Sequence, residues 1–183
     1  MDQSRTSFPI RFKDKKGRSI VIRPYERTDH DKLQEMYDYF EPKGLEAGLP
    51  PPEDNVRHHW LQTVTSSFFN LIALHRDQVV GHAALDLWDP SLCPEYLIFI
   101  LQGFRNCGLG TAMSEIMRDM AQDSGCKKIW LTVRSANTCA IRVFKKVRFR
   151  FRGGIDIDRE MELIIRQKTS PHPSGKRKTT KIP

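Results

Sequence analysis

The sequence reads Arg105-Asn106-Cys107-Gly108-Leu109-Gly110-Thr111 where an apolar run, 96–101, gives way to an amphipathic segment, 108–123. Glycine has no Cβ, so the backbone at Gly108 and Gly110 can approach a ligand closely. The first amides of a helix have no partner within the helix and carry partial positive charge. The heptapeptide therefore predicts an anion site suited to a pyrophosphate, where Arg105 adds a charged contact. A plain helix start with flexible glycines is the alternative.

Two other phosphate-binding loops are excluded by the residues that follow. A P-loop ends in Gly-Lys-Ser or Gly-Lys-Thr, whereas Gly110 is followed here by Thr111 and Ala112. A dinucleotide-binding fingerprint requires a third glycine or an alanine where this chain has Met113.

The pattern of apolar residues predicts one mixed α/β domain. Continuous or alternating apolar runs predict strands at 20–23, 68–75, 79–87, 96–101, 128–133, 149–151 and 160–165. Helical spacing predicts helices at 29–40, 53–64, 108–123 and 137–147. We expect an N-terminal extension at 1–19, the domain at 20–166 and a basic, disordered tail at 167–183.

A second motif follows Gly108 by 29 residues, across a predicted helix and strand. It reads Asn137-x-x-Ala140-Ile141-x-x-Phe144-x-x-x-x-Phe149. Together the two motifs resemble the signatures of the GNAT superfamily of N-acetyltransferases: Arg/Gln-x-x-Gly-x-Gly, followed by Asn-x-x-Ala-hydrophobic-x-x-Tyr-x-x-x-Gly-Phe. The resemblance spans about 20–165 and is weakest before Val79.

The resemblance implies an α/β fold with a central mixed sheet of six to seven strands, flanked by about four helices. Its fourth and fifth strands, 96–101 and 128–133, would splay apart to admit acetyl-coenzyme A. The chain would transfer an acetyl group to a primary amine by direct attack in a ternary complex. The implied cofactor contacts are Ile98, Phe99, Ile100, Arg105, Asn106, Cys107, Gly108, Leu109, Gly110, Thr111, Asn137 and Phe144, and no metal is implied.

The implied catalytic groups are less complete than the cofactor contacts. Glu95 precedes the cofactor strand, where several members of the superfamily carry a general base, and an attacking amine must lose a proton. The usual tyrosine acid of the second motif is replaced by Phe144, which has no proton to give. His82, Cys139 and Tyr96 are candidate substitutes, beside water or unassisted departure of the thiolate. The alternative function is a non-catalytic acyl-coenzyme-A sensor.

The acceptor is predicted only as an amine. The loop at 41–52 and its neighbours are acid-rich, through Glu41, Glu46, Glu53 and Asp54, which favours an amine or a lysine side chain. A solvated acidic loop is the alternative, and a small molecule, a protein lysine and a protein N-terminus stay open as acceptors.

Bulk composition limits the partners. Six lysines and arginines follow residue 165 with no acid, which leaves residues 1–165 with only +2 of the net charge of +8. A nucleic-acid partner is therefore not predicted. The four cysteines lie too far apart for a compact zinc site. Without an apolar stretch of about 20 residues or a signal-peptide core, we expect a cytoplasmic protein with no membrane partner, and a homodimer stays open.

Overall fold

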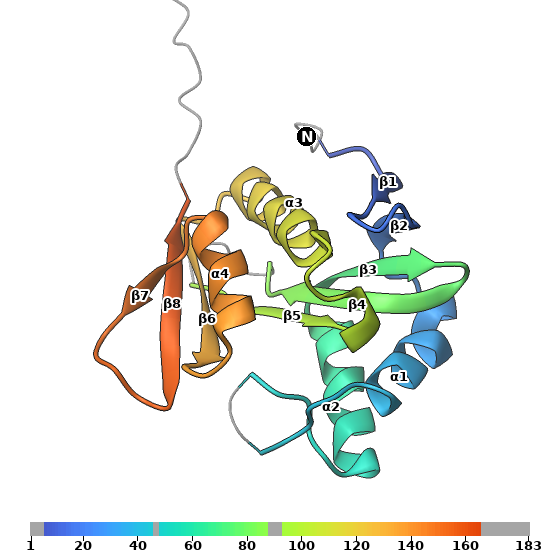
Figure 1. Ribbon diagram of the computed structural model, residues 1–183, viewed down its shortest axis with the longest axis horizontal. Coiled ribbons are helices and arrows are strands. Elements are labelled where there is room, and N and C mark those ends of the chain that lie inside the picture. Colours follow the sequence, from blue (N-terminus) through green and yellow to red (C-terminus); the bar gives the residue numbers. More distant parts are fainter. Residues whose placement is uncertain (1–5, 46–47, 88–92, 166–183) are drawn as a thin grey trace, which may run out of the picture.

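The computed structural model describes residues 6–45, 48–87 and 93–165 (Figure 1). The helices are α1 (His30–Asp38), α2 (Asp54–Ser67), α3 (Leu109–Asp123) and α4 (Thr138–Lys146), with 3-10 turns η1 (Arg27–Asp29) and η2 (Gln102–Phe104). The strands are β1 (Ile10–Lys13), β2 (Ser19–Pro24), β3 (Phe69–His75), β4 (Gln78–Leu85), β5 (Tyr96–Ile100), β6 (Lys128–Arg134), β7 (Arg150–Arg152) and β8 (Asp158–Ile164). All four predicted helices are present, and the α/β class is confirmed.

The strand count and the sheet differ from the prediction. In the part of the chain that the structure describes, eight strands form two antiparallel sheets, one in the order β1-β2-β3-β4-β5 and the other in the order β6-β8-β7. The additional strand is β1, which pairs with β2 and lies in the segment expected to be an extension. The single parallel pairing among the described residues is the isolated bridge between Glu95 and Trp130, which joins β5 to β6. The predicted splay therefore falls between the fifth and sixth strands of the chain.

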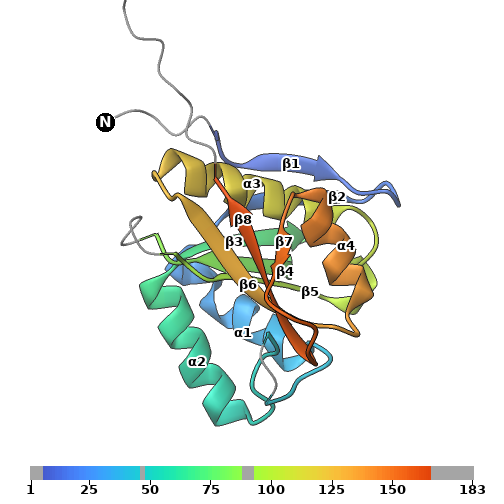
Figure 2. The same ribbon diagram turned by 90° about the vertical axis from the view of Figure 1, so that its left-hand side faces the viewer.

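Helices cover both faces of the sheet (Figure 2). Helices α1 and α2 lie on one face, where Leu33, Tyr37 and Leu61 pack with Phe99 of β5. Helices α3 and α4 lie on the other, over a larger core that includes Met113, Phe144 and Tyr96. Because side chains alternate along a strand, β5 contributes Leu97 and Phe99 to the first core and Tyr96, Ile98 and Ile100 to the second.

Candidate active site

A cavity of about 470 Å³ opens where β5 and β6 separate, and we refer to it as the central cavity. Its walls come from β5, β6, the start of α4 and the loop that precedes α2. The lining residues are Pro42, Gly48, Leu49, Tyr96, Leu97, Ile98, Phe99, Arg105, Leu131, Thr132, Val133, Arg134, Ala136, Asn137, Ala140 and Phe144.

The ladder register leaves backbone groups of both strands facing this cavity. The Leu101 amide donates to the Val80 carbonyl, so alternate residues of β5 bond to β4 and those between them, Ile98 and Ile100, turn their amides and carbonyls toward β6. The Ile165 amide donates to the Lys127 carbonyl, which by the same alternation turns the Thr132 backbone toward β5. The gap thus offers an extended ligand the hydrogen bonds of a missing strand.

Not every predicted β5 residue faces this gap through its backbone. Ile98 and Ile100 do, but Phe99 is in register with His82 on β4, so its backbone turns toward β4. Phe99 is nevertheless one of the residues that line the central cavity. The Ile100 carbonyl already accepts a hydrogen bond from Arg105 Nε at 2.8 Å.

The glycine loop, residues 105–111, leads into α3 and contains the first residues of that helix. Gly108 is the N-cap residue, with φ of 95°, and no side chain caps the helix. Asn106 also has positive φ, 59°. Cys107 is buried, and its thiol donates to the Phe104 carbonyl at 2.7 Å, away from the helix mouth. No side chain of the described residues caps the first-turn amides of α3, and binding of an anion there stays a prediction.

Glycine occupies the two positions of the loop for different structural reasons. A Cβ at Gly108 would have ordinary contacts, 3.6 Å from Phe12, but the positive φ disfavours any side chain. Gly110 packs inward instead, where a Cβ would lie 3.3 Å from Ile100 Cδ1 and 3.7 Å from Val143. Close packing of α3 on β5 and α4, rather than access for a ligand, explains Gly110.

The turn between β1 and β2 supports the glycine loop from behind. The Lys15 amide donates to the Cys107 carbonyl at 3.1 Å. Arg18 donates to the Gly103 carbonyl at 3.1 Å and lies 3.9 Å over the Phe104 ring. Asp14 anchors this arginine. Burial would raise the pKa of Asp14, but hydrogen bonds from the Arg18 backbone and guanidinium and from the Lys16 amide lower it to about 2. Sequence reasoning missed this support because no motif marks it.

Asn137 begins α4. Its side-chain oxygen accepts a hydrogen bond from the Ala140 amide at 3.1 Å, which explains why this residue type opens the second motif. Asn137 also lines the central cavity, and its contact with the cofactor stays a prediction. Phe144 is buried on the same wall, 5.7 Å from Phe149 and 6.4 Å from Tyr96 between ring centroids. Phe144 therefore contributes packing and no proton.

The three substitutes for the missing acid are placed differently. Tyr96 lines the central cavity, its hydroxyl is bonded to Ser114 at 2.9 Å, and burial raises its pKa. His82 lies in the core between Tyr37 and Asn70, and burial lowers its pKa to about 3. Cys139 is exposed on α4, beside Arg142. Of these three residues, Tyr96 alone is among the described residues that line the central cavity.

Glu95 stands at the closed end of the gap, where it bridges to Trp130. It is half-buried, and burial raises its pKa above the ordinary value. Alternation along β5 places its side chain on the face of Leu97 and Phe99, the face of α1 and α2. It is not among the described residues that line the central cavity.

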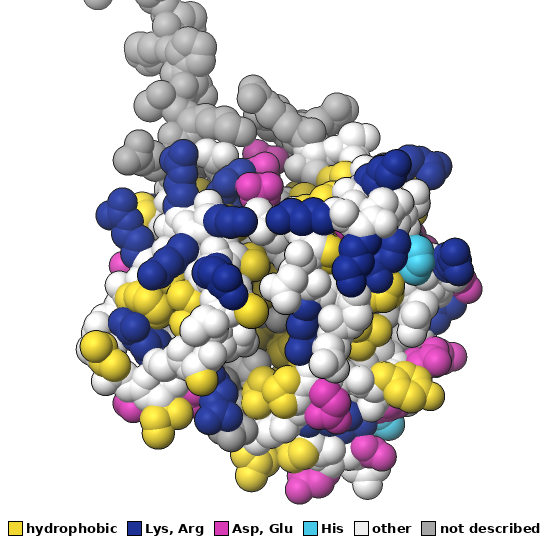
Figure 3. All heavy atoms as spheres, viewed as in Figure 1, with side chains coloured by type: hydrophobic (Ala, Val, Ile, Leu, Met, Phe, Trp, Pro, Cys, Tyr) yellow, Lys and Arg dark blue, Asp and Glu magenta, His cyan; other side chains and the backbone are white. Residues whose placement is uncertain are grey.

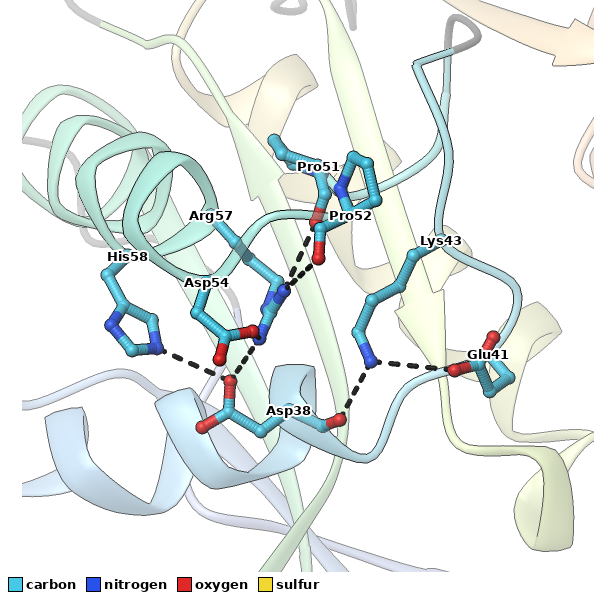
Figure 4. A network of polar contacts seen from close by, with 8 residues as sticks. All are labelled: Asp38, Glu41, Lys43, Pro51, Pro52, Asp54, Arg57 and His58. Atoms are coloured by element: carbon cyan, nitrogen blue, oxygen red, sulfur yellow. Dashed lines mark hydrogen bonds and ion pairs between the residues drawn. The ribbon is translucent and has the colours of Figure 1, made fainter.

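The proline-rich loop, residues 41–52, crosses this face, and the structure describes it at 41–45 and 48–52. Gly48 presses on β6, because a Cβ there would lie 2.8 Å from the Thr132 carbonyl. The buried Arg57 holds the end of the loop through the Pro51 and Pro52 carbonyls (Figure 4). Lys43 holds its start through the Asp38 carbonyl at 2.8 Å.

The predicted acidic character of this region is partly neutralised. Asp54 pairs with Arg57 at 2.7 Å, and Glu41 pairs with Lys43 at 3.5 Å. Glu53 is exposed, and Glu46 lies outside the described residues. Within the described ranges no group of three His, Cys, Asp or Glu side chains could hold a metal ion. No helix that the structure describes is long and apolar enough to cross a bilayer.

Comparison with known proteins agrees with this architecture. Residues 33–149 match the model of the acetyltransferase (GNAT) family. The L-amino acid N-acetyltransferase AaaT of Escherichia coli K12 is 27% identical over 140 residues, which cover 73% of this chain and 85% of that protein.

Solved structures share the fold at low sequence identity. The GNAT domain of S. lividans PAT superposes with a TM-score of 0.74 at 16% identity, covering 85% of this chain and 96% of that one. The structure of yncA from Salmonella typhimurium with its cofactor acetyl-CoA gives a TM-score of 0.64 at 17% identity, covering 84% and 98%.

The fold and the family match define an acyltransferase that uses acetyl-coenzyme A. The chain belongs to the GNAT superfamily of N-acetyltransferases.

Proposed function

We propose that this protein acetylates a primary amine by direct attack in a ternary complex, with both substrates meeting in the central cavity. The observation that carries the proposal is the gap between β5 and β6 beside an α3 N-terminus that no described side chain caps. The cofactor supplies the acetyl group as a thioester. A ligand with an extended arm and a pyrophosphate fits this pairing of unpaired strand groups with unpaired helix amides.

Chain groups would hold the cofactor at three places. The amides of residues 106–111 would bind the pyrophosphate, and the backbone groups of Ile98 and Ile100 would bind the extended arm. Asn137 would contact the arm from the start of α4. The surrounding charge supports an anionic ligand, because residues 124–155 hold nine lysines and arginines and no acid. Basic side chains also gather over α3, α4 and the β1–β2 hairpin on one face (Figure 3).

Glu95 is our candidate general base. An amine attacks only when unprotonated, so a proton must pass to a base or to water. Glu95 lies on the side of the sheet where the proline-rich loop and α2 would present an acceptor. Glu95 is not among the described residues that line the central cavity. The proton would therefore pass from the amine to Glu95 through a bridging water. Its raised pKa makes it a stronger proton acceptor than an exposed glutamate.

Departure of the thiolate needs no protein acid in this proposal. A thiol has a pKa of roughly 8.5, so a thiolate is a tolerable leaving group in water near neutral pH. Tyr96 lines the cavity, but burial raises its pKa, which makes proton transfer to a thiolate unfavourable. Phe144 then serves only to shape the wall.

The acceptor is either a small amine or a protein amine. The similarity to an L-amino acid N-acetyltransferase makes free amino acids the first acceptors to test. Acetyl-coenzyme A should first be titrated calorimetrically into the full chain. Thiol release should then be followed with the twenty L-amino acids, polyamines and lysine-containing peptides. Binding without turnover over this panel would support a sensor, and absence of binding would refute the proposal.

A further inference from the structure

Arg105, the first residue of the glycine loop, uses its side chain to bind backbone carbonyls of two other segments. Its Nε donates to the Ile100 carbonyl at 2.8 Å, and a terminal nitrogen donates to the Glu41 carbonyl in the proline-rich loop. The guanidinium also lies 5.1 Å from the centroid of the Phe40 ring. One side chain thus joins the end of β5 to the start of the proline-rich loop, 64 residues earlier in the sequence.

Phe40 connects the Arg105 side chain to the central cavity through Phe99. Its ring is buried and packs edge-on against Phe99, with centroids 5.5 Å apart. Phe99 lines the central cavity. The cation–π contact of Arg105 is therefore with a buried ring that packs directly against a residue of the cavity wall.

Arg57 secures the other end of the same loop. It is 1% exposed, and its guanidinium donates to the Pro52 carbonyl at 3.0 Å and to Asp38 at 2.6 Å. Figure 4 shows this arginine between α1 and the prolines that precede α2. The two described parts of the loop, 41–45 and 48–52, are also joined by a hydrogen bond from the Gly44 amide to the Pro50 carbonyl. The loop is held at both ends, by arginines from different parts of the fold.

We infer that Arg105 is a positioning residue for the acceptor, which sets the proline-rich loop against the cavity, and not a ligand of the cofactor phosphates. This inference rests on the proposed function, because it assigns the loop to the acceptor side. Two of the guanidinium nitrogens already donate to backbone carbonyls, and a phosphate would have to draw the group away from both. The loop amides bind the pyrophosphate without it. Arg105 thereby links the cofactor loop to acceptor affinity.

The test compares Arg105→Met with Arg57→Met in the full chain. Methionine keeps an unbranched apolar stem but removes every donor. Arg118→Met, on the outer part of α3, is the matched control for a lost positive charge. Each protein is titrated with acetyl-coenzyme A by calorimetry, and KM and kcat are measured with the fastest acceptor of the amine panel. The rate of trypsin cleavage after Lys43 reports how well the proline-rich loop is ordered, and it does not depend on acetyl transfer.

Loss of charged hydrogen bonds to the loop should raise KM for the amine about ten-fold or more in both site variants. Cleavage after Lys43 should become several-fold faster, while Kd for acetyl-coenzyme A should stay within about two-fold of wild type. Arg118→Met should match wild type in all three measurements. If Arg105→Met instead weakens acetyl-coenzyme A binding ten-fold and leaves the amine KM and the cleavage rate unaltered, it is a phosphate ligand and the inference is wrong.

The same data separate this inference from the proposed function. If wild-type protein fails to bind acetyl-coenzyme A, the proposed function fails, and the proteolysis still decides whether Arg105 orders the loop. If wild type binds and turns over but neither arginine variant alters the amine KM or the proteolysis, only the inference fails. Circular dichroism of Arg57→Met identifies unfolding, in which case Arg57→Lys replaces it with the charge retained.

Discussion

Substitution of the two loop glycines by alanine should separate the two roles that the structure gives them. Gly108 has φ of 95°, where an L-residue is strained by about 1–2 kcal/mol. Gly108→Ala should lower the free energy of unfolding by that amount and the melting temperature by roughly 2–8 °C. It should also weaken acetyl-coenzyme A binding at least about ten-fold, because relief of the strain would turn the first amides of α3 away from the phosphates.

Gly110→Ala should behave differently. Within a helix, alanine is favoured over glycine by about 1 kcal/mol. Its Cβ would lie 3.3 Å from Ile100 Cδ1, so the flexible end of that side chain must move by a few tenths of an ångström. The two effects oppose one another, and we expect the free energy of unfolding to change by less than about 0.5 kcal/mol. Urea denaturation and calorimetry measure both quantities. A larger loss of stability for Gly110→Ala than for Gly108→Ala, or unaltered affinity in Gly108→Ala, would refute the reasoning.

Substitutions at three further positions test the proton chemistry and the end of α4. Glu95→Gln should lower kcat and remove the acidic limb of its pH profile, and an unchanged limb would exclude Glu95 as the base. Because burial raises the pKa of Glu95, its contribution favours folding below the unfolded pKa and is lost as pH rises through the folded pKa. Urea denaturation should therefore show Glu95→Gln gaining stability relative to wild type as pH rises through that pKa. Tyr96→Phe should leave kcat within about three-fold of wild type, since a phenol of raised pKa is a poor donor to a thiolate; a hundred-fold loss in stopped-flow thiol release would instead make it the acid. Arg148→Gly should raise the unfolding free energy by up to about 1 kcal/mol, because Arg148 has φ of 80°, and Arg148→Ala should show no such gain in the same urea titration.

The helices and most of the strands could be predicted because their apolar spacing is local. Strands β3, β4, β5 and β6 and all four helices appear within a few residues of their predicted bounds. Strand β1 was not predicted, since only Ile10 and Phe12 alternate with polar residues there, which is too short a pattern. The break between the two sheets depends on pairing between distant strands, which local periodicity does not encode.

Individual site residues illustrate the same limit. The helix start at Gly108 was predictable because a glycine-rich turn into a helix has a local geometry, whereas binding of a pyrophosphate there stays a prediction. The side-chain direction of Arg105 was not predictable, because it depends on the Glu41 carbonyl and the Phe40 ring, both supplied by a loop far away in sequence. Gly110 was interpreted as an access position for the same reason, since its partners Ile100 and Val143 become neighbours only in the folded chain.

The glycine loop and the proline-rich loop are therefore joined by direct contacts, although they lie far apart in the sequence. Arg18 and Lys15 support the glycine loop from the N-terminal hairpin, and Arg105 passes from it to the proline-rich loop. On the proposed function, a ligand that binds the loop amides would restrain residues 105–111, and through Arg105 it would also restrain the proline-rich loop. Binding free energies of linked sites are reciprocal, so an acceptor that favours the restrained loop must also tighten the hold on the cofactor. Affinity for acetyl-coenzyme A should thus rise when a saturating acceptor analogue is present, and Arg105→Met should abolish that rise.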